Sequence, residues 1–118
     1  MNELIENIFS NFDVYGSGSP IPVKFLFYDG HGEPYVTYQQ VEADNSLSGD
    51  DGLIGYVDYY DFDIFSKGNH KEIINNLKKI LKKNGFVWQP SRSGPDMYEP
   101  DTGYYHKTLN FAYLREEK

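Results

Sequence analysis

The fold is decided by the stretch NHKEIINNLKKILKKNGF, residues 69–86. Its apolar residues recur at helical spacing and form one stripe: Ile73, Ile74, Leu77, Ile80 and Leu81. Asn69 with Glu72 three residues later forms a capping pair for the first turn, and Gly85 tolerates the left-handed conformation of a helix end. The stretch therefore predicts one long amphipathic helix, whose apolar side needs a partner surface.

Strand-like segments before and after this helix supply that surface. Each is rich in β-branched or aromatic residues, and we expect them at residues 23–28, 35–41, 53–65, 86–88 and 104–114. The first two are expected to pair as a hairpin across a turn at residues 29–34. In the third, Tyr60, Phe62 and Ile64 alternate with aspartates, which is typical of a strand with one buried face.

The first residues of the chain predict a second helix, because apolar side chains recur at helical spacing over residues 2–12. Strands collected around one or two helices are typical of the α+β class. We therefore expect a mainly antiparallel sheet of about four to five strands, with an N-terminal helix and the long amphipathic helix packed on it.

The length of the chain indicates one domain, residues 1–118. Residues 42–52 are acidic and interrupted by glycine, and residues 89–103 contain three prolines. Both segments are predicted to be mobile loops, where binding contacts concentrate.

Composition limits the classes of function. The formal net charge is −7 and the pI is near 4.8, so general attraction to nucleic-acid phosphates is not expected. The chain has no cysteine, which excludes disulfides and thiol catalysis. No run of about twenty apolar residues occurs, and no secretion-signal pattern opens the chain, so we expect a soluble cytoplasmic protein.

Metal sites have weak support in the sequence. Residues 44–49 imitate the first half of an EF-hand calcium loop, but position twelve is Gly55 and strand residues follow. His31, His70 and His106 are widely spaced, so each is interpreted as a turn or surface histidine. We expect no metal in this chain.

Cofactor binding and catalysis have no better support. The Gly30-x-Gly32 pair precedes an extended segment, so no helix end is placed to receive a pyrophosphate. There is no GxSxG nucleophile elbow. Asp58, Asp61 and Asp63 lie on one expected strand, where alternation with core aromatics favours solvated positions over a carboxylate site. We expect no cofactor and no enzymatic activity.

Four segments carry a resemblance to a known family. They are GHGEPYVTY at residues 30–38, YDFDIF at 60–65, the helix that ends in NGF at 84–86, and DTGYYHKTLNF at 101–111. Together they resemble the tail completion or tail terminator proteins of long-tailed bacteriophages and prophages of low-GC Gram-positive bacteria. The resemblance covers most of the chain from Pro20 onward, in matching order.

The resemblance implies a structural virion protein at the head–tail interface. Proteins of this family form a hexameric ring that caps the tail tube and joins it to the head connector, so the implied partners are further copies of the chain, the tail tube protein and the head-completion protein. DNA would pass through the ring without specific binding, and no membrane is involved. The family has no catalytic residues to transfer, and assembly would take place in the host cytoplasm.

Candidate assembly contacts are Asp50, Asp51, Tyr98 and Glu99, chosen because we expect them to be exposed on the two long loops. A solvated loop position is the alternative for each. A different class of function also fits the charge and size: a small acidic cytoplasmic binding module, of the immunity or antitoxin kind, that covers a basic partner protein.

Overall fold

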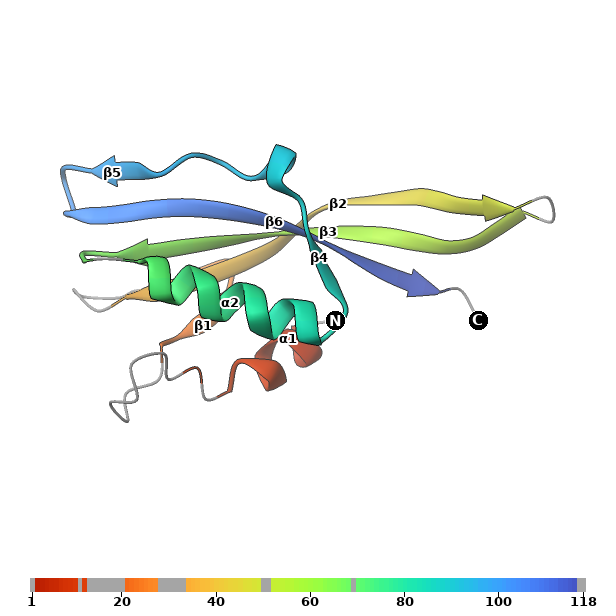
Figure 1. The fold of residues 1–118 in the computed structure, drawn as a ribbon, viewed down its shortest axis with the longest axis horizontal. Helices are drawn as coiled ribbons and strands as arrows, with labels where there is room; N and C mark the ends of the chain where they lie inside the picture. The colour runs from red at the N-terminus through yellow and green to blue at the C-terminus, as the bar shows by residue number, and fades with distance from the viewer. Residues whose placement is uncertain are drawn as a thin grey trace.

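The computed structural model describes residues 2–10, 12, 21–27, 34–49, 52–68 and 70–116. Its elements, in chain order, are α1 (Asn2–Ile8), β1 (Val23–Phe25), β2 (Tyr35–Gly49), β3 (Gly52–Ser66), α2 (Lys71–Lys83), β4 (Phe86–Trp88), the 3-10 turn η1 (Pro90–Arg92), β5 (Met97–Glu99) and β6 (Tyr104–Glu116). Figure 1 shows both helices on one side of a twisted sheet, with β2, β3 and the end of β6 extending beyond them.

The sheet has six strands, in the order β1-β2-β3-β6-β4, and β5 pairs with β6 beside β4. All pairings are antiparallel except β1 with β2, which is parallel. The α+β class is therefore confirmed, with a mixed sheet that has more strands than expected. The predicted hairpin of residues 23–28 with 35–41 is wrong, because the chain turns away at Leu26 instead of folding straight back.

The core lies between the sheet and the two helices. Its largest fully buried side chains include Tyr38, Tyr60, Phe62, Phe86 and Phe111. Phe62 sits at the centre, with ring centroids 5.7 Å from Phe111 and 5.9 Å from Tyr38. Burial, with the charge of Glu6 as the smaller cause, raises the pKa of Tyr38 to about 12. The alternation predicted for residues 60–64 therefore places its apolar side in the core, as expected.

Helix α2 is 13 residues long and buries one side, through Ile73, Ile74, Leu77 and Leu81. It is shorter at both ends than the predicted stretch. His70 occupies the N-cap position without a side-chain hydrogen bond, and the predicted cap Asn69 lies outside the described residues. At the other end, Gly85 has φ +91°, which confirms its predicted left-handed conformation.

Residues 42–49, predicted as part of a loop, belong to strand β2. This strand pairs with β3 from Tyr35↔Phe65 to Gly49↔Gly52, so these two strands form the long hairpin of the molecule. The register shifts three times, first between Gln40 and Glu42. A polar, glycine-containing strand specifies its register weakly, and such bulges are the usual result. The residues 44–49 that imitate a calcium loop are therefore paired in a sheet.

Residues 89–103, also predicted as a loop, follow the edge of β6. Between the pairs Trp88↔Phe111 and Met97↔His106 the chain advances nine residues against five on β6, so four residues are looped out. Backbone hydrogen bonds continue through this bulge, from Gln89 N to Asn110 O and from Gly94 N to Thr108 O. The prolines therefore interrupt the strand locally while the edge pairing persists.

Candidate functional site

A ladder of polar side chains crosses the sheet on the face opposite the core. The register places Asp63 beside Thr108, and Asp61 beside Asn110. Thr108 Oγ1 donates to Asp63 Oδ1 at 2.5 Å, and Asn110 Nδ2 donates to Asp61 Oδ1 at 2.8 Å. Both aspartates are half-buried, so the solvated positions expected from the alternation are in fact hydrogen-bonded cross-strand pairs.

Burial, partly offset by the Asn110 hydrogen bond and reinforced by the charge of Asp63, raises the pKa of the Asp61 carboxyl. A carboxylate in this position is stabilised by its donor, while desolvation and the neighbouring charge oppose its ionised form. The ladder therefore links β3 to β6 by hydrogen bonds, while burial and the Asp63 charge disfavour ionisation of Asp61.

His106 lies at the end of this ladder between two carboxylates. Its Nε2 is 3.0 Å from Asp63 Oδ1, and its Nδ1 is 3.6 Å from Glu99 Oε2. Its ring stacks on Phe65, with centroids 4.3 Å apart. The two ring nitrogens of His106 therefore face carboxylates on two different strands, β3 and β5.

The four predicted contact residues have different surroundings. Tyr98 is 56% exposed, as expected, and its ring centroid is 5.0 Å from that of Tyr105. Glu99 is half-exposed, and it also accepts a hydrogen bond from Thr102 Oγ1 at 3.1 Å, so it takes part in local structure. Asp50 and Asp51 lie outside the described residues. An assembly role for any of the four stays a prediction.

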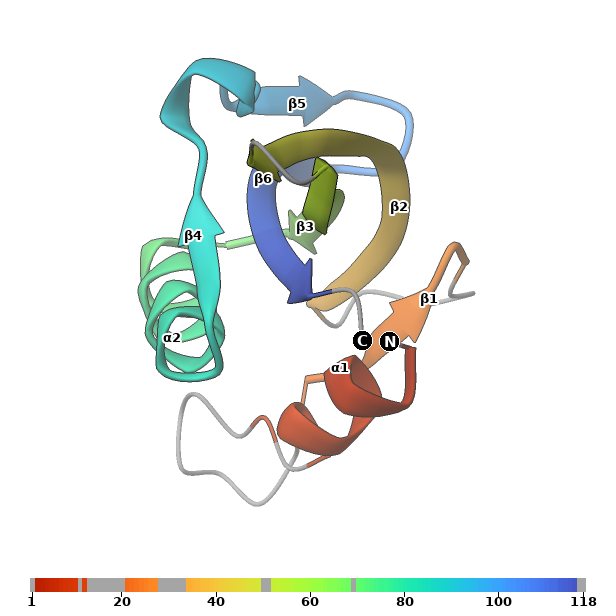
Figure 2. The same ribbon diagram turned by 90° about the vertical axis from the view of Figure 1, so that its right-hand side faces the viewer.

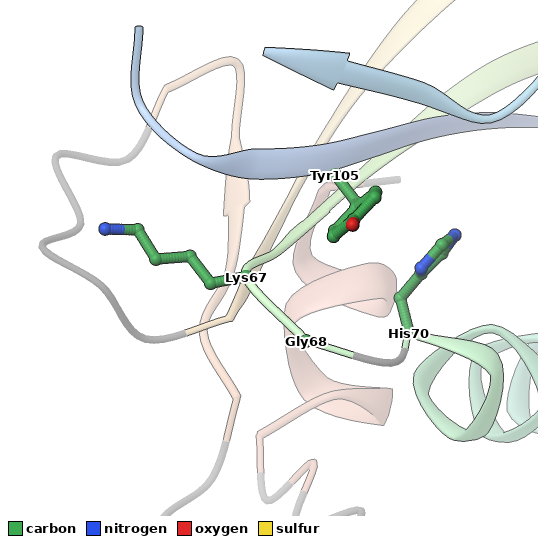
Figure 3. A pocket seen from close by; sticks show the side chains of 4 residues that line it. All are labelled: Lys67, Gly68, His70 and Tyr105. Carbon is green, nitrogen blue, oxygen red and sulfur yellow. The ribbon is translucent and has the colours of Figure 1, made fainter. Parts of the chain in front are cut away.

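A shallow depression of about 390 Å³ lies where β3 leads into α2. Its lining residues are Lys67, Gly68, His70 and Tyr105. Figure 3 shows the rings of His70 and Tyr105 side by side, with the Lys67 side chain extending away from them. His70 Nε2 contacts Asp96 Oδ1 at 3.1 Å, and this hydrogen bond is the main reason that the pKa of Asp96 is lowered. No serine, threonine or cysteine is among the described residues that line the depression.

A second, apolar groove lies beside α2 and has a volume of about 340 Å³. Its lining residues are Lys78, Lys82, Phe86, Val87, Trp88 and Phe111. The Lys78 ammonium lies 3.5 Å from the Trp88 ring centroid, and Trp88 Nε1 donates to Ser93 Oγ at 3.0 Å. Burial, with the charge of Lys107 as the smaller cause, lowers the pKa of Lys78. The tryptophan is therefore held in one orientation at the rim of the groove.

At the other edge of the sheet, three consecutive apolar residues face solvent after β1. Phe25, Leu26 and Phe27 are 43%, 58% and 74% exposed. Leu26 has φ +65°, and Phe27 N donates to Phe25 O at 2.7 Å, so Leu26 is the centre of a γ-turn. A strand was expected over residues 23–28, but β1 ends at Phe25. Phe25 is still paired with Tyr38 of β2, so the sequence offered no signal that the next two residues leave the sheet.

Metal binding has no structural support in the described part of the chain. No group of three or more histidine or acidic side chains there could hold a metal ion. His70 contacts Asp96 and His106 contacts Asp63, so the two histidines bind different carboxylates. His31 lies outside the described ranges. Neither helix among the residues placed by the structure is long and apolar enough to cross a membrane.

Comparison with known proteins does not assign the chain to a family. No protein-family model matches it, and a search of curated proteins returns no significant match. The geometry described above is therefore the basis for a functional proposal.

Proposed function

We propose that this chain is a structural subunit of a bacteriophage tail, which completes the tail and joins it to the head connector as a ring around the DNA channel. The observation that carries the proposal is the arm formed by β2, β3 and the end of β6. In Figure 1 these strands continue well past both helices, and the molecule measures 52 × 28 × 22 Å. Two- and three-stranded arms gain stability when another surface covers them.

The arm is a suitable element for contact with neighbouring proteins. Its strands pair, with three register shifts, as far as Gly49 and Gly52. The hydrogen-bonded ladder gives a defined shape to a segment that has no helix beside it. In this proposal the arm reaches the tail tube protein or the head-completion protein. Asp50 and Asp51, which lie between Gly49 and Gly52 in the sequence and outside the described residues, are the expected contact residues.

The charge of the chain is compatible with a DNA channel. A formal net charge of −7 disfavours retention of phosphates, so an acidic channel lining would let DNA pass without binding. In this proposal the apolar side of helix α2 packs on the sheet of its own subunit. Its lysine-bearing side faces away from the channel. Neither assignment requires an active site.

The test is the assembly state. Light scattering and negative-stain microscopy would be applied to the purified protein alone, and after mixing with tailless heads and headless tails of the phage that encodes it. We expect rings of about six subunits, or added density at the head-proximal end of the tail. A monomer that binds neither particle would rule out this function.

A second function, an acidic module that covers a basic partner protein, is favoured by one observation. Tyr98 and Tyr105 form an exposed aromatic row that continues to His70, beside the Asp96 carboxylate. Aromatic residues are enriched at protein interfaces, and complementary charge favours association with a basic partner. This alternative predicts one-to-one binding to a basic protein from the cytoplasmic extract and no ring.

A further inference from the structure

The two outer strands of the sheet, β1 and β4, present different surfaces. The β1 edge carries a projecting turn with three exposed apolar side chains, Phe25, Leu26 and Phe27. The β4 edge carries the apolar groove, whose rim includes Val87 and Trp88, 60% and 39% exposed. Figure 2 shows β1 and β4 on different sides of the molecule, so the turn and the groove of one chain do not meet.

The turn is strained for a leucine. A positive φ costs a residue with a Cβ atom about 1–2 kcal/mol, and a γ-turn of this hand is rare. Two backbone hydrogen bonds hold it, from Leu26 N to Tyr38 O at 2.9 Å and from Phe27 N to Phe25 O at 2.7 Å. Glycine would adopt this conformation without strain. The side chain of Leu26 is 58% exposed, so the strain is not repaid by burial within the monomer.

The groove is large enough to receive a side chain of the turn. A cavity of about 150 Å³ is sufficient to hold a benzene ring, and the groove measures about 340 Å³. Phe86 and Phe111 in its lining are almost fully buried. An apolar pocket of this kind gains free energy when an aliphatic or aromatic side chain displaces its water.

The charges beside the two edges are opposite. Helix α1 lies next to β1, and its segment carries the exposed Glu3 and Glu6, with Lys24 of β1 as the nearby cation. Helix α2 lies next to β4 and carries five lysines and one glutamate over Lys71–Lys83. A contact between two β1 edges would bring glutamates together, and a contact between two β4 edges would bring lysines together. Contact between unlike edges joins opposite charges.

We propose that the Phe25–Phe27 turn of one copy of this chain inserts into the groove beside Val87 and Trp88 of the next copy. The occupant of the groove is thus a second copy of the chain in a head-to-tail contact. Head-to-tail contacts repeat around an axis and close into a ring when the rotation between subunits permits. The inference rests on the proposed function and assigns the surfaces that join the subunits.

The first test is Leu26→Gly, which separates strain from assembly. Glycine removes the strain, so the isolated subunit keeps or gains resistance to urea. It also removes the inserted side chain, so the dissociation constant between subunits should rise about tenfold or more. Met97→Ala is the matched control, because Met97 is 51% exposed on β5 and belongs to neither the turn nor the groove. Its rings should match those of the unmodified protein.

The second test is cross-linking, which is clean because the chain has no cysteine. The double variant Leu26→Cys/Val87→Cys, treated with a bifunctional maleimide, should form a ladder up to the full ring. Leu26→Cys/Met97→Cys is the matched control. Met97 is 51% exposed on β5, which pairs with β6 at the end away from β4. It should give no such ladder.

The outcomes separate this inference from the function on which it rests. Rings that weaken with Leu26→Gly, together with a ladder from the first cysteine pair, support the assignment. If Leu26→Gly forms rings as stable as those of the unmodified protein and the first cysteine pair gives no ladder, the assigned surfaces are wrong, but the ring function is not contradicted. An unmodified chain that forms no ring, alone or on tails, overturns both.

Discussion

The two faces of the central sheet use opposite chemistry on the same strands. On the helix side, Tyr60, Phe62 and Ile64 of β3 are at most 2% exposed, within an apolar core. On the other side, Asp61 and Asp63 of the same strand bond to polar side chains of β6. The first face gains stability from burial, and the second from hydrogen bonds that satisfy half-buried carboxylates. Successive residues of one strand can therefore contribute through different forces.

This difference predicts unequal costs for substitutions on the two faces. An apolar core side chain leaves a cavity when it is truncated, and the surroundings close it only partly. A cross-strand hydrogen bond that is removed from a half-buried site is partly replaced by water. Substitutions on the helix side should therefore cost the most, and the polar face should show smaller effects that depend on pH.

The largest effect is expected for Phe62→Ala, at the centre of the core. The loss should be about 3–5 kcal/mol in the free energy of unfolding, from lost burial and a residual cavity. Urea denaturation, monitored by circular dichroism below the concentration of ring formation, measures it. Phe27→Ala is the control, because Phe27 is 74% exposed and its loss should change stability by about 0.5 kcal/mol or less. Equal effects of the two changes would refute the assignment of the core.

Asn110→Ala should have the next largest effect. Asn110 is 2% exposed, and its amide donates to the half-buried Asp61 carboxylate. Its removal leaves that carboxylate without this donor and should cost about 1–3 kcal/mol. The same denaturation measurement applies, with the exposed Asn75→Ala on α2 as the control. A cost below that of the control would mean that the ladder contributes nothing.

Thr108→Val should cost less, about 1 kcal/mol, because valine keeps the shape of threonine and removes one hydroxyl donor to Asp63. Thr102→Val removes a hydroxyl that donates to Glu99 at an exposed position and accepts from the Tyr104 backbone N–H at 3.3 Å, so its effect should be smaller. The difference in thermal midpoint between these two variants reports the contribution of the polar face. A larger shift for Thr102→Val would contradict it.

The smallest and most specific effect is expected for Asp61→Asn. Because burial raises the pKa of Asp61, its ionised form destabilises the folded chain at neutral pH, and that cost disappears as the pH falls below the ordinary value of 3.8. The variant should therefore be more stable than the unmodified chain at neutral pH and equal to it at low pH. Asp63→Asn is the control, and it should lose stability because the Thr108 hydroxyl then donates to a neutral amide oxygen instead of a carboxylate. Urea midpoints across the pH range would show both trends, and a gain for Asp61→Asn that persists at low pH would contradict the assignment.

The candidate surfaces were only partly accessible from the sequence. Tyr98 was correctly expected to be exposed, since a proline-rich segment surrounds it. The groove at Val87 and Trp88, and the turn at Phe25–Phe27, were not found. Apolar residues in a short segment are equally consistent with burial and exposure, and the outcome depends on whether a neighbouring strand covers them.

The sequence by itself determined the elements that depend on local periodicity. Helix α2, the burial of Tyr60 and Phe62, the short strand β4 and the left-handed Gly85 all follow from spacing or from single-residue conformational preference. These properties are set within a few residues, so a linear pattern is sufficient to predict them.

Only the tertiary structure decided which strands pair. The parallel contact of β1 with β2, the strand character of residues 42–49 and the bulged edge from β4 to β5 depend on hydrogen bonds to distant segments. A polar segment becomes a strand when a partner such as β3 satisfies its backbone groups, and no local pattern contains that partner. The polar ladder of Asp61 and Asp63 arises in the same way, because residues 45 or more positions away on β6 supply its donors.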